Sequence, residues 1–197
     1  MKSERTAEIH RTTRETQVSI FLNLDGSGTW EIETGIPFFD HMLSHVAVHS
    51  LFDLKITCQG DLEVDAHHSV EDVGIALGQA LAQALGDKAG IQRYGSMLMP
   101  MDEALVQVAL DLSGRGLLVY EVSFAASQVG QFDTELVPEF LRALAHNAGL
   151  TLHVSLVHGT NTHHIIEAIF KGLGRALGQA TALDPRRREI PSTKGVL

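Results

Sequence analysis

The 197-residue chain has a single cysteine, Cys58, so it has no disulfide framework. Cations are also scarce, because 15 Lys and Arg stand against 24 Asp and Glu, a formal net charge of −9. Nucleic-acid binding needs basic surface, so this balance argues against it. No stretch approaches the ~20 apolar residues of a membrane span, and the N-terminus has no apolar signal core. These absences predict a cytoplasmic protein that binds neither nucleic acid nor membrane.

Histidine is abundant instead, with 11 residues, and four of them form two matching motifs. His67 and Glu71 belong to the sequence HHSVE, and His163 and Glu167 belong to HHIIE. Residues four apart share one face of a helix. Each pair can therefore hold a transition metal between an imidazole and a carboxylate, a ligand set that suits Mn, Fe, Co or Zn.

The second histidine of each motif, His68 or His164, adds a geometric demand. Neighbouring helical residues point about a hundred degrees apart, so adjacent histidines cannot easily serve one ion. If all are ligands, two repeats supply two metal sites reciprocally. Spacing leaves open whether those repeats lie in one chain or in neighbouring subunits.

A simpler interpretation is helix capping. Asp65 and Asn161 precede the two motifs and are good N-cap residues, and a glutamate in the first turn favours the helix dipole. Capping alone can explain either motif by itself. Two copies of the motif at a fixed offset favour metal ligation over capping alone.

The chain also repeats itself on a larger scale. Shifted by 96 residues, HHSVEDVGIALGQALAQA aligns with HHIIEAIFKGLGRALGQA, and about half of the positions are identical. In the first half the patterns predict strands at 6–13, 15–24, 29–34 and 51–59 and helices at 37–49 and 67–85, with a hairpin turn at 25–28. In the second half they predict strands at 93–101, 104–112, 117–124 and 150–158 and helices at 135–148 and 162–183.

These elements predict an α+β fold made of two similar two-layer halves from an internal duplication. Each half has a roughly four-stranded mixed sheet with two helices on one face. We expect the first repeat at 1–90, the second at 91–185, and a basic, irregular C-terminal loop at 186–197.

Six stretches, in order, resemble the imidazoleglycerol-phosphate dehydratase family of histidine biosynthesis. They are RTTRET at 11–16, GIPFFDHML at 35–43, DAHHSVED at 65–72, DLSGR at 111–115, NTHHIIEAIFK at 161–171 and PSTKG at 191–195. The resemblance implies halves like domain 2 of ribosomal protein S5. It also implies a homo-oligomer of about 24 subunits with sites shared between subunits, and two Mn²⁺ per active site.

The resemblance assigns two ligand sets by position. The first metal is expected on His41, His67, Glu71 and His164, and the second on His68, Glu139, His163 and Glu167. Glu139 departs from the histidine that relatives often carry, although a carboxylate can also hold Mn²⁺.

The resemblance also assigns the substrate site, and it implies that the C-terminal loop at 186–197 contributes to the active site. It places an acid/base carboxylate at Glu15, which the strand pattern alone would leave as an exposed residue. The expected substrate-binding residues are His45, where relatives often have Gln, and His49, Arg93, Arg115, Lys171, Ser192, Thr193 and Lys194. Guanidinium and ammonium groups suit phosphate, but each cation taken alone would be a surface charge.

The expected reaction is the dehydration of D-erythro-imidazoleglycerol phosphate to imidazole-acetol phosphate by a carbon–oxygen lyase. Two Lewis-acidic metals would stabilise a metal-bound imidazolate, which expels the hydroxyl through a diazafulvene-like intermediate. Two alternatives stay open from the residues: a dinuclear metal hydrolase, and a structural shell in which metals merely join subunits. Replacing Glu15 separates these readings.

Overall fold

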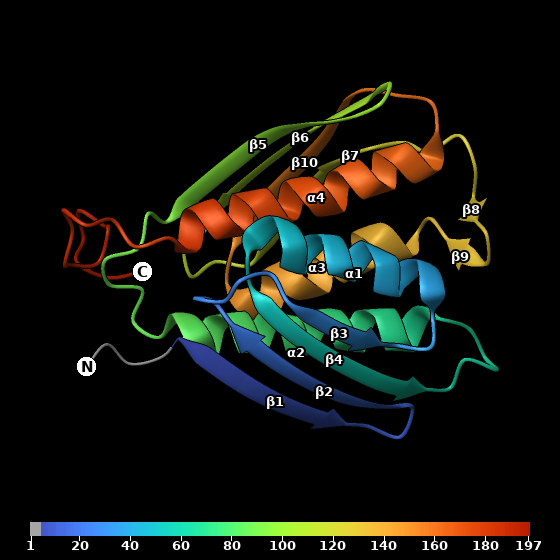
Figure 1. The fold of residues 1–197 in the computed structure, drawn as a ribbon, viewed down its shortest axis with the longest axis horizontal. Coiled ribbons are helices and arrows are strands. Elements are labelled where there is room, and N and C mark those ends of the chain that lie inside the picture. The colour runs from blue at the N-terminus through green and yellow to red at the C-terminus, as the bar shows by residue number, and fades with distance from the viewer. Residues whose placement is uncertain (1–4) are drawn as a thin grey trace.

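The computed structural model describes residues 5–197, which form two four-stranded sheets and four long helices (Figure 1). The first half contains β1 (Thr6–Thr12), β2 (Thr16–Asn23), β3 (Trp30–Glu33), α1 (Pro37–Ser50), β4 (Asp53–Gly60) and α2 (His67–Leu85). The second half contains β5 (Tyr94–Met101), β6 (Ala104–Asp111), β7 (Leu117–Glu121), α3 (Leu136–Ala148), β10 (Thr151–His158) and α4 (Thr162–Thr181).

The two sheets have the same topology. Their strand orders are β1-β2-β4-β3 and β5-β6-β10-β7. In each sheet the last pair is parallel, β3 with β4 and β7 with β10, and the other neighbours are antiparallel. The predicted α+β fold, with a duplicated four-stranded mixed sheet, is therefore confirmed.

The helices lie between the sheets (Figure 1). Helices α1 and α2 contact the first sheet, and α3 and α4 contact the second. The halves meet through their helices, α2 against α3 and α1 against α4. Phe140 joins them in the core, because its ring centroid lies 5.2 Å from that of Phe39 and 5.4 Å from that of Phe170.

Two glycines allow these helices to approach closely. A Cβ on Gly78 of α2 would lie 2.8 Å from the carbonyl oxygen of Leu144, and one on Gly174 of α4 would lie 2.9 Å from that of Val46. Such contacts leave no room for a side chain. The two glycines are separated by the repeat offset, so both helix pairs use the same packing.

The hairpin predicted at residues 25–28 is wrong. Strand β4 lies between β2 and β3, which do not pair. Asp53, at the start of β4, accepts hydrogen bonds from the backbone amides of Ser27 (2.8 Å) and Thr29 (3.1 Å), so the glycine-rich loop lies against the beginning of β4. These bonds, with one from the Thr29 hydroxyl, lower the pKa of Asp53 to about 2.

A short hairpin was not predicted: β8 (Gln128–Val129) pairs with β9 (Phe132–Asp133). Its Phe132 is buried and stacks on Phe39 of α1 at 6.1 Å between ring centroids. The hairpin thus covers the N-terminal end of α1. Within residues 5–197, no helix is both long and apolar enough to cross a membrane.

Candidate active site

Both histidine motifs begin helices, and Asn161 is the N-cap of α4 as predicted. The N-cap of α2 is Ala66, which has no side-chain cap, but Asp65 before it accepts one amide of the first turn. The amide of His67 donates to Asp65 Oδ1 at 2.7 Å. The amides of His163 and His164 donate to Asn161 Oδ1 at 3.0 and 3.3 Å. Capping and ligation are compatible, because the caps use backbone amides and leave the imidazole and carboxylate groups for other contacts.

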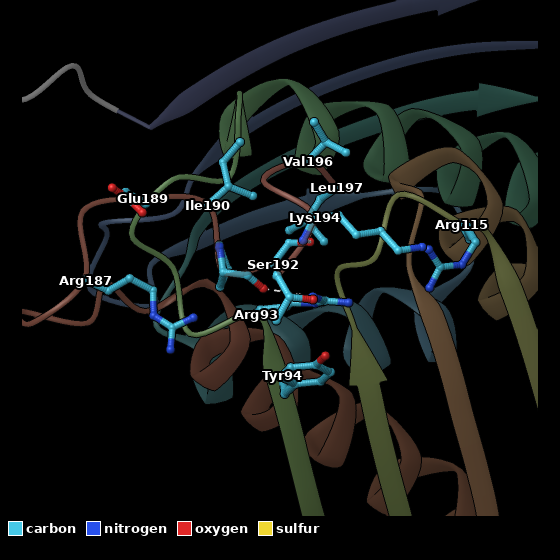
Figure 2. A pocket seen from close by; sticks show the side chains of 12 residues that line it. Arg93, Tyr94, Arg115, Arg187, Glu189, Ile190, Ser192, Lys194, Val196 and Leu197 are labelled. Atoms are coloured by element: carbon cyan, nitrogen blue, oxygen red, sulfur yellow. Dashed lines mark hydrogen bonds between the residues drawn. The ribbon is translucent and has the colours of Figure 1, made fainter.

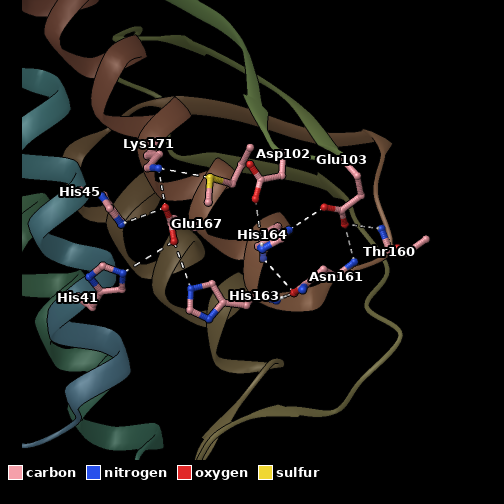
Figure 3. A network of polar contacts seen from close by, with 11 residues as sticks. His41, His45, Asp102, Glu103, Thr160, Asn161, His163, His164, Glu167 and Lys171 are labelled. Atoms are coloured by element: carbon pink, nitrogen blue, oxygen red, sulfur yellow. Dashed lines mark hydrogen bonds and ion pairs between the residues drawn. The ribbon is translucent and has the colours of Figure 1, made fainter.

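Glu167 is the centre of a cluster between α1 and α4 (Figure 3). Its Oε2 lies 3.2 Å from His163 Nε2 and 3.8 Å from His41 Nε2. Its Oε1 lies 2.5 Å from Lys171 Nζ and 3.6 Å from His45 Nε2. The Glu167 side chain is only 9% exposed. This buried carboxylate therefore lies among nitrogen atoms of side chains from two helices, α1 and α4.

Three members of this cluster could hold a metal ion. One ligand atom each from His41, His45 and Glu167 lies within 4.8 Å of the others. Among residues 5–197, His45 Nε2 is buried without a hydrogen-bond partner. Burial lowers the pKa of His45 to about 4, so its imidazole is neutral at physiological pH and can offer a lone pair. A neutral imidazole nitrogen beside the buried carboxylate of Glu167 is a suitable pair of ligands for a divalent cation.

The charge of Glu167 is also set for ligation. Burial acts to raise the pKa of this carboxyl, but the hydrogen bond and charge of Lys171, with a hydrogen bond from His163, outweigh burial and lower it overall. Glu167 is therefore ionised at neutral pH, the form in which a carboxylate binds metal.

The second histidine of each motif, His68 in α2 and His164 in α4, contacts a carboxylate outside the Glu167 cluster. His68 Nδ1 lies 3.0 Å from Asp61 Oδ2, and His164 Nδ1 lies 2.6 Å from Glu103 Oε2. These bonds raise the pKa of both histidines. The adjacent histidines thus face different surroundings, as the helical angle predicts.

The equivalent position between α2 and α3 is a shallow groove of about 270 Å³. Glu71 and Glu139 both line it, and Arg142 forms an ion pair with Glu139. Ile75 also lines this groove, at the α2 position that corresponds to Lys171 in the repeat. The two halves therefore offer unequal surroundings to their carboxylates.

Neither predicted set of four ligands is gathered within residues 5–197. The structure brings His41, of the first set, next to His163 and Glu167, of the second. No three members of one set form a metal-capable group in this part of the chain. His45, predicted to bind substrate, joins the metal-capable group instead.

Five of the predicted substrate-binding residues line one cavity of about 640 Å³ (Figure 2). They are Arg93, Arg115, Ser192, Thr193 and Lys194. Arg187 lines the same cavity. Among the described residues, four cationic side chains and one acidic side chain, Glu189, therefore line it. This cationic lining suits a phosphate.

The C-terminal segment forms much of this cavity and is tied to the second sheet. Arg93 donates to the carbonyl oxygen of Pro191 at 2.8 Å and to Asp111 Oδ1 at 2.7 Å. The hydrogen bond to Asp111 also raises the pKa of Arg93. The Arg93 guanidinium is thus fixed beside the start of β5 and the end of β6, where it holds the C-terminal segment through Pro191.

The cavity and the Glu167 cluster lie at opposite ends of α4. The amide of Arg93 donates to the carbonyl oxygen of Ala180, in the last turns of α4, whereas His163 lies in its first turn. At a rise of about 1.5 Å per residue, the helix between them spans on the order of 25 Å. His45, His49 and Lys171 lie on the cluster side, where the His45 and His49 ring centroids are 5.9 Å apart and Lys171 pairs with Glu167.

Known proteins resemble the chain along its whole length. The family model described as imidazoleglycerol-phosphate dehydratase matches residues 34–177. The imidazoleglycerol-phosphate dehydratase of Moorella thermoacetica is 59% identical over 193 residues, which cover 98% of each chain. That of Syntrophobacter fumaroxidans is 57% identical over 197 residues and all of both chains. The chain belongs to the imidazoleglycerol-phosphate dehydratase family.

Solved structures agree with this assignment. The crystal structure of imidazoleglycerol-phosphate dehydratase from Staphylococcus aureus subsp. aureus N315 is 45% identical, with a TM-score of 0.83, and covers 91% of this chain and 99% of that one. The enzyme from Pyrococcus furiosus, in complex with (S)-C348, is 39% identical with a TM-score of 0.84, covering 96% and 100%. The protein is therefore a hydro-lyase of histidine biosynthesis, as its sequence predicts.

The sequence motifs did not predict Asp61 and Glu103, the carboxylates that contact His68 and His164. Asp61 is seven residues before its histidine and could have been noticed as an acid at a strand end. Glu103 is 61 residues from its partner. No local pattern connects such distant positions, so only the fold reveals this contact.

Proposed function

We propose that the protein dehydrates D-erythro-imidazoleglycerol phosphate to imidazole-acetol phosphate in the cytoplasm, with two Mn²⁺ per active site. The family membership supports the reaction. The observation that carries the metal requirement is the buried carboxylate of Glu167, which lies 3.2 Å from His163 and in a metal-capable group with His41 and His45. In the complete site His45 would contact the substrate rather than the metal.

The proposed ligands are two sets that draw on both repeats. His41, His67, Glu71 and His164 would hold one ion, and His68, Glu139, His163 and Glu167 the other. Bound Mn²⁺ would supply Lewis-acid stabilisation of negative charge on the substrate's imidazole ring, which has no carbonyl group to activate the neighbouring C–H. Glu139 would have to leave Arg142, its ion-pair partner in the subunit, to become a ligand.

We place each active site between subunits of a large homo-oligomer of about 24 chains. A three-carbon chain joins the ring and the phosphate of the substrate. It cannot span the roughly 20 Å of α4 that separates Glu167 from Ala180, the residue beside the cationic cavity. One subunit must therefore supply the phosphate cavity while others supply the histidines. The scattered ligand sets support the same arrangement.

The chain's own residues then divide the work. Arg93, Arg115 and Lys194 would bind phosphate oxygens, with the Ser192 and Thr193 side chains beside them. His45, His49 and Lys171 would line the ring side of the substrate, where they lie together beside Glu167. Holding both ends orients the hydroxyl that leaves and the hydrogen that is removed.

Glu15 is the proposed acid/base group. It lies in the turn before β2, with a side chain 52% exposed and Oε1 3.9 Å from His68 Nε2. A carboxylate at that place can take the proton from the carbon next to the departing hydroxyl and return it to solvent or product. Its exposure in a single subunit is consistent with a site completed by a neighbour.

Mixed oligomers test the shared site. Glu167→Gln and Arg115→Met should each be inactive alone, but co-expressed subunits should regain activity, because some sites then combine an intact Glu167 from one chain with an intact Arg115 from another. The measurement is the dehydratase rate of purified mixed oligomers.

The matched control combines Glu167→Gln with His163→Ala. These two side chains are 3.2 Å apart on one helix and must enter the same site from the same subunit. This mixture should stay inactive. Recovery in the control, or none in the first mixture, would contradict the proposed division between subunits.

A further inference from the structure

Glu103 connects the turn between β5 and β6 to the start of α4 (Figure 3). Its Oε1 accepts hydrogen bonds from the amides of Asn161 (2.8 Å) and Thr160 (3.2 Å). Its Oε2 lies 2.6 Å from His164 Nδ1. The two carboxylate oxygens therefore have different partners: Oε1 binds backbone amides and Oε2 contacts the imidazole.

An ionised carboxylate can only accept hydrogen bonds, so His164 Nδ1 must carry a proton. In the neutral imidazole the other nitrogen, Nε2, then has the free lone pair that a metal needs. We propose that Glu103 is a positioning residue that fixes the tautomer and ring direction of His164 for metal binding at Nε2. This inference rests on the proposed function, which makes His164 a ligand.

Asp61 has the same relation to His68. Its two carboxylate oxygens lie 3.2 and 3.0 Å from His68 Nδ1. The two acids do not correspond in the repeat, because Asp61 follows β4 whereas Glu103 lies between β5 and β6. Two unrelated positions that supply the same contact indicate that the imidazoles need it, rather than that the duplication copied it.

The two carboxylates differ in what else they hold, and this gives a matched pair of variants. In Glu103→Gln, the two backbone amides continue to bind the side-chain oxygen, so the NH₂ group faces His164 Nδ1. An NH₂ group donates, which forces the imidazole proton onto Nε2 and blocks that ligand. In Asp61→Asn, no backbone amide within residues 5–197 holds the side chain, which can rotate and keep an oxygen toward His68 Nδ1.

We expect Glu103→Gln to weaken binding of one of the two Mn²⁺ ions by about 10- to 100-fold, measured by calorimetric titration of the stripped full-length protein. Asp61→Asn should change affinity much less, and Glu103→Asp, which keeps an acceptor, should restore most of the loss. Unchanged affinity for both ions in Glu103→Gln would overturn the proposal.

A second readout is independent of metal. Solid-state ¹⁵N NMR of histidine-labelled, metal-free protein should show His164, assigned with His164→Gln, protonated at Nδ1 in the wild type and at Nε2 in Glu103→Gln. A wild-type His164 protonated only at Nε2 would overturn the inference without any variant having to fold. If the wild-type protein binds no Mn²⁺, the proposed metal requirement fails, while this spectrum still decides whether Glu103 sets the tautomer.

Discussion

Glu167→Gln should lower the dehydratase rate on the order of 10³-fold, because loss of Lewis-acid stabilisation from one ion is worth several kcal/mol. The amide keeps the size of the side chain and can still accept a hydrogen bond from Lys171, which now contacts Oε1 at 2.5 Å. It lacks the negative charge that a divalent ion requires. Steady-state kinetics at saturating Mn²⁺, with bound metal counted in parallel, checks this.

Glu33→Gln is the matched control, since Glu33 is an exposed carboxylate at the end of β3. It should leave both rate and metal content near those of the wild type. If Glu167→Gln retained two Mn²⁺ per chain and full turnover, the α1–α4 cluster would have no part in the reaction. A loss of rate with full metal content would make Glu167 something other than a ligand.

Glu15→Gln should reduce turnover by about 10²- to 10⁴-fold, the range that general acid–base catalysis contributes. Metal content and oligomer size should not change, because the side chain is half exposed and makes no hydrogen bond that holds the fold of residues 5–197. The measurements are turnover, metal stoichiometry and the mass of the assembly by light scattering.

Arg14→Gln, in the same turn, is the control and should retain activity. If Glu15→Gln dissolved the oligomer while the control did not, a structural shell would explain the metals better than a lyase. If it removed one Mn²⁺, Glu15 would be a ligand, as its 3.9 Å distance from His68 Nε2 would then allow.

Much of the fold could be predicted because the repeat is visible in the sequence. The matching of His67 with His163, the alternating strands and the proline-led first turn of α1 are local signals. The pairing of the strands depends on residues that are distant in the sequence. The loop at 25–28 has the residues of a hairpin turn, but Asp53 binds its amides and β4 lies between β2 and β3. A glycine-rich turn specifies a bend without specifying the partner strand.

In the candidate site, too, contacts between residues close in sequence could be predicted and contacts between distant residues could not. Helical spacing predicted that Glu167 and His163 would meet, and they do at 3.2 Å. It could not predict that α1 would bring His45 to the same carboxylate, because that contact depends on the close packing that Gly174 permits. The ligand sets themselves stay a prediction, since they combine residues that a single subunit keeps apart.

The most direct test of the account is reconstitution with metal. The full-length protein is stripped with a chelator, Mn²⁺ is restored in steps, and conversion of imidazoleglycerol phosphate to imidazole-acetol phosphate is followed while bound metal is counted. We expect no turnover in the stripped protein and full turnover at about two Mn²⁺ per chain. Metal bound at that ratio without dehydration, or dehydration by the stripped protein, would contradict the proposed function.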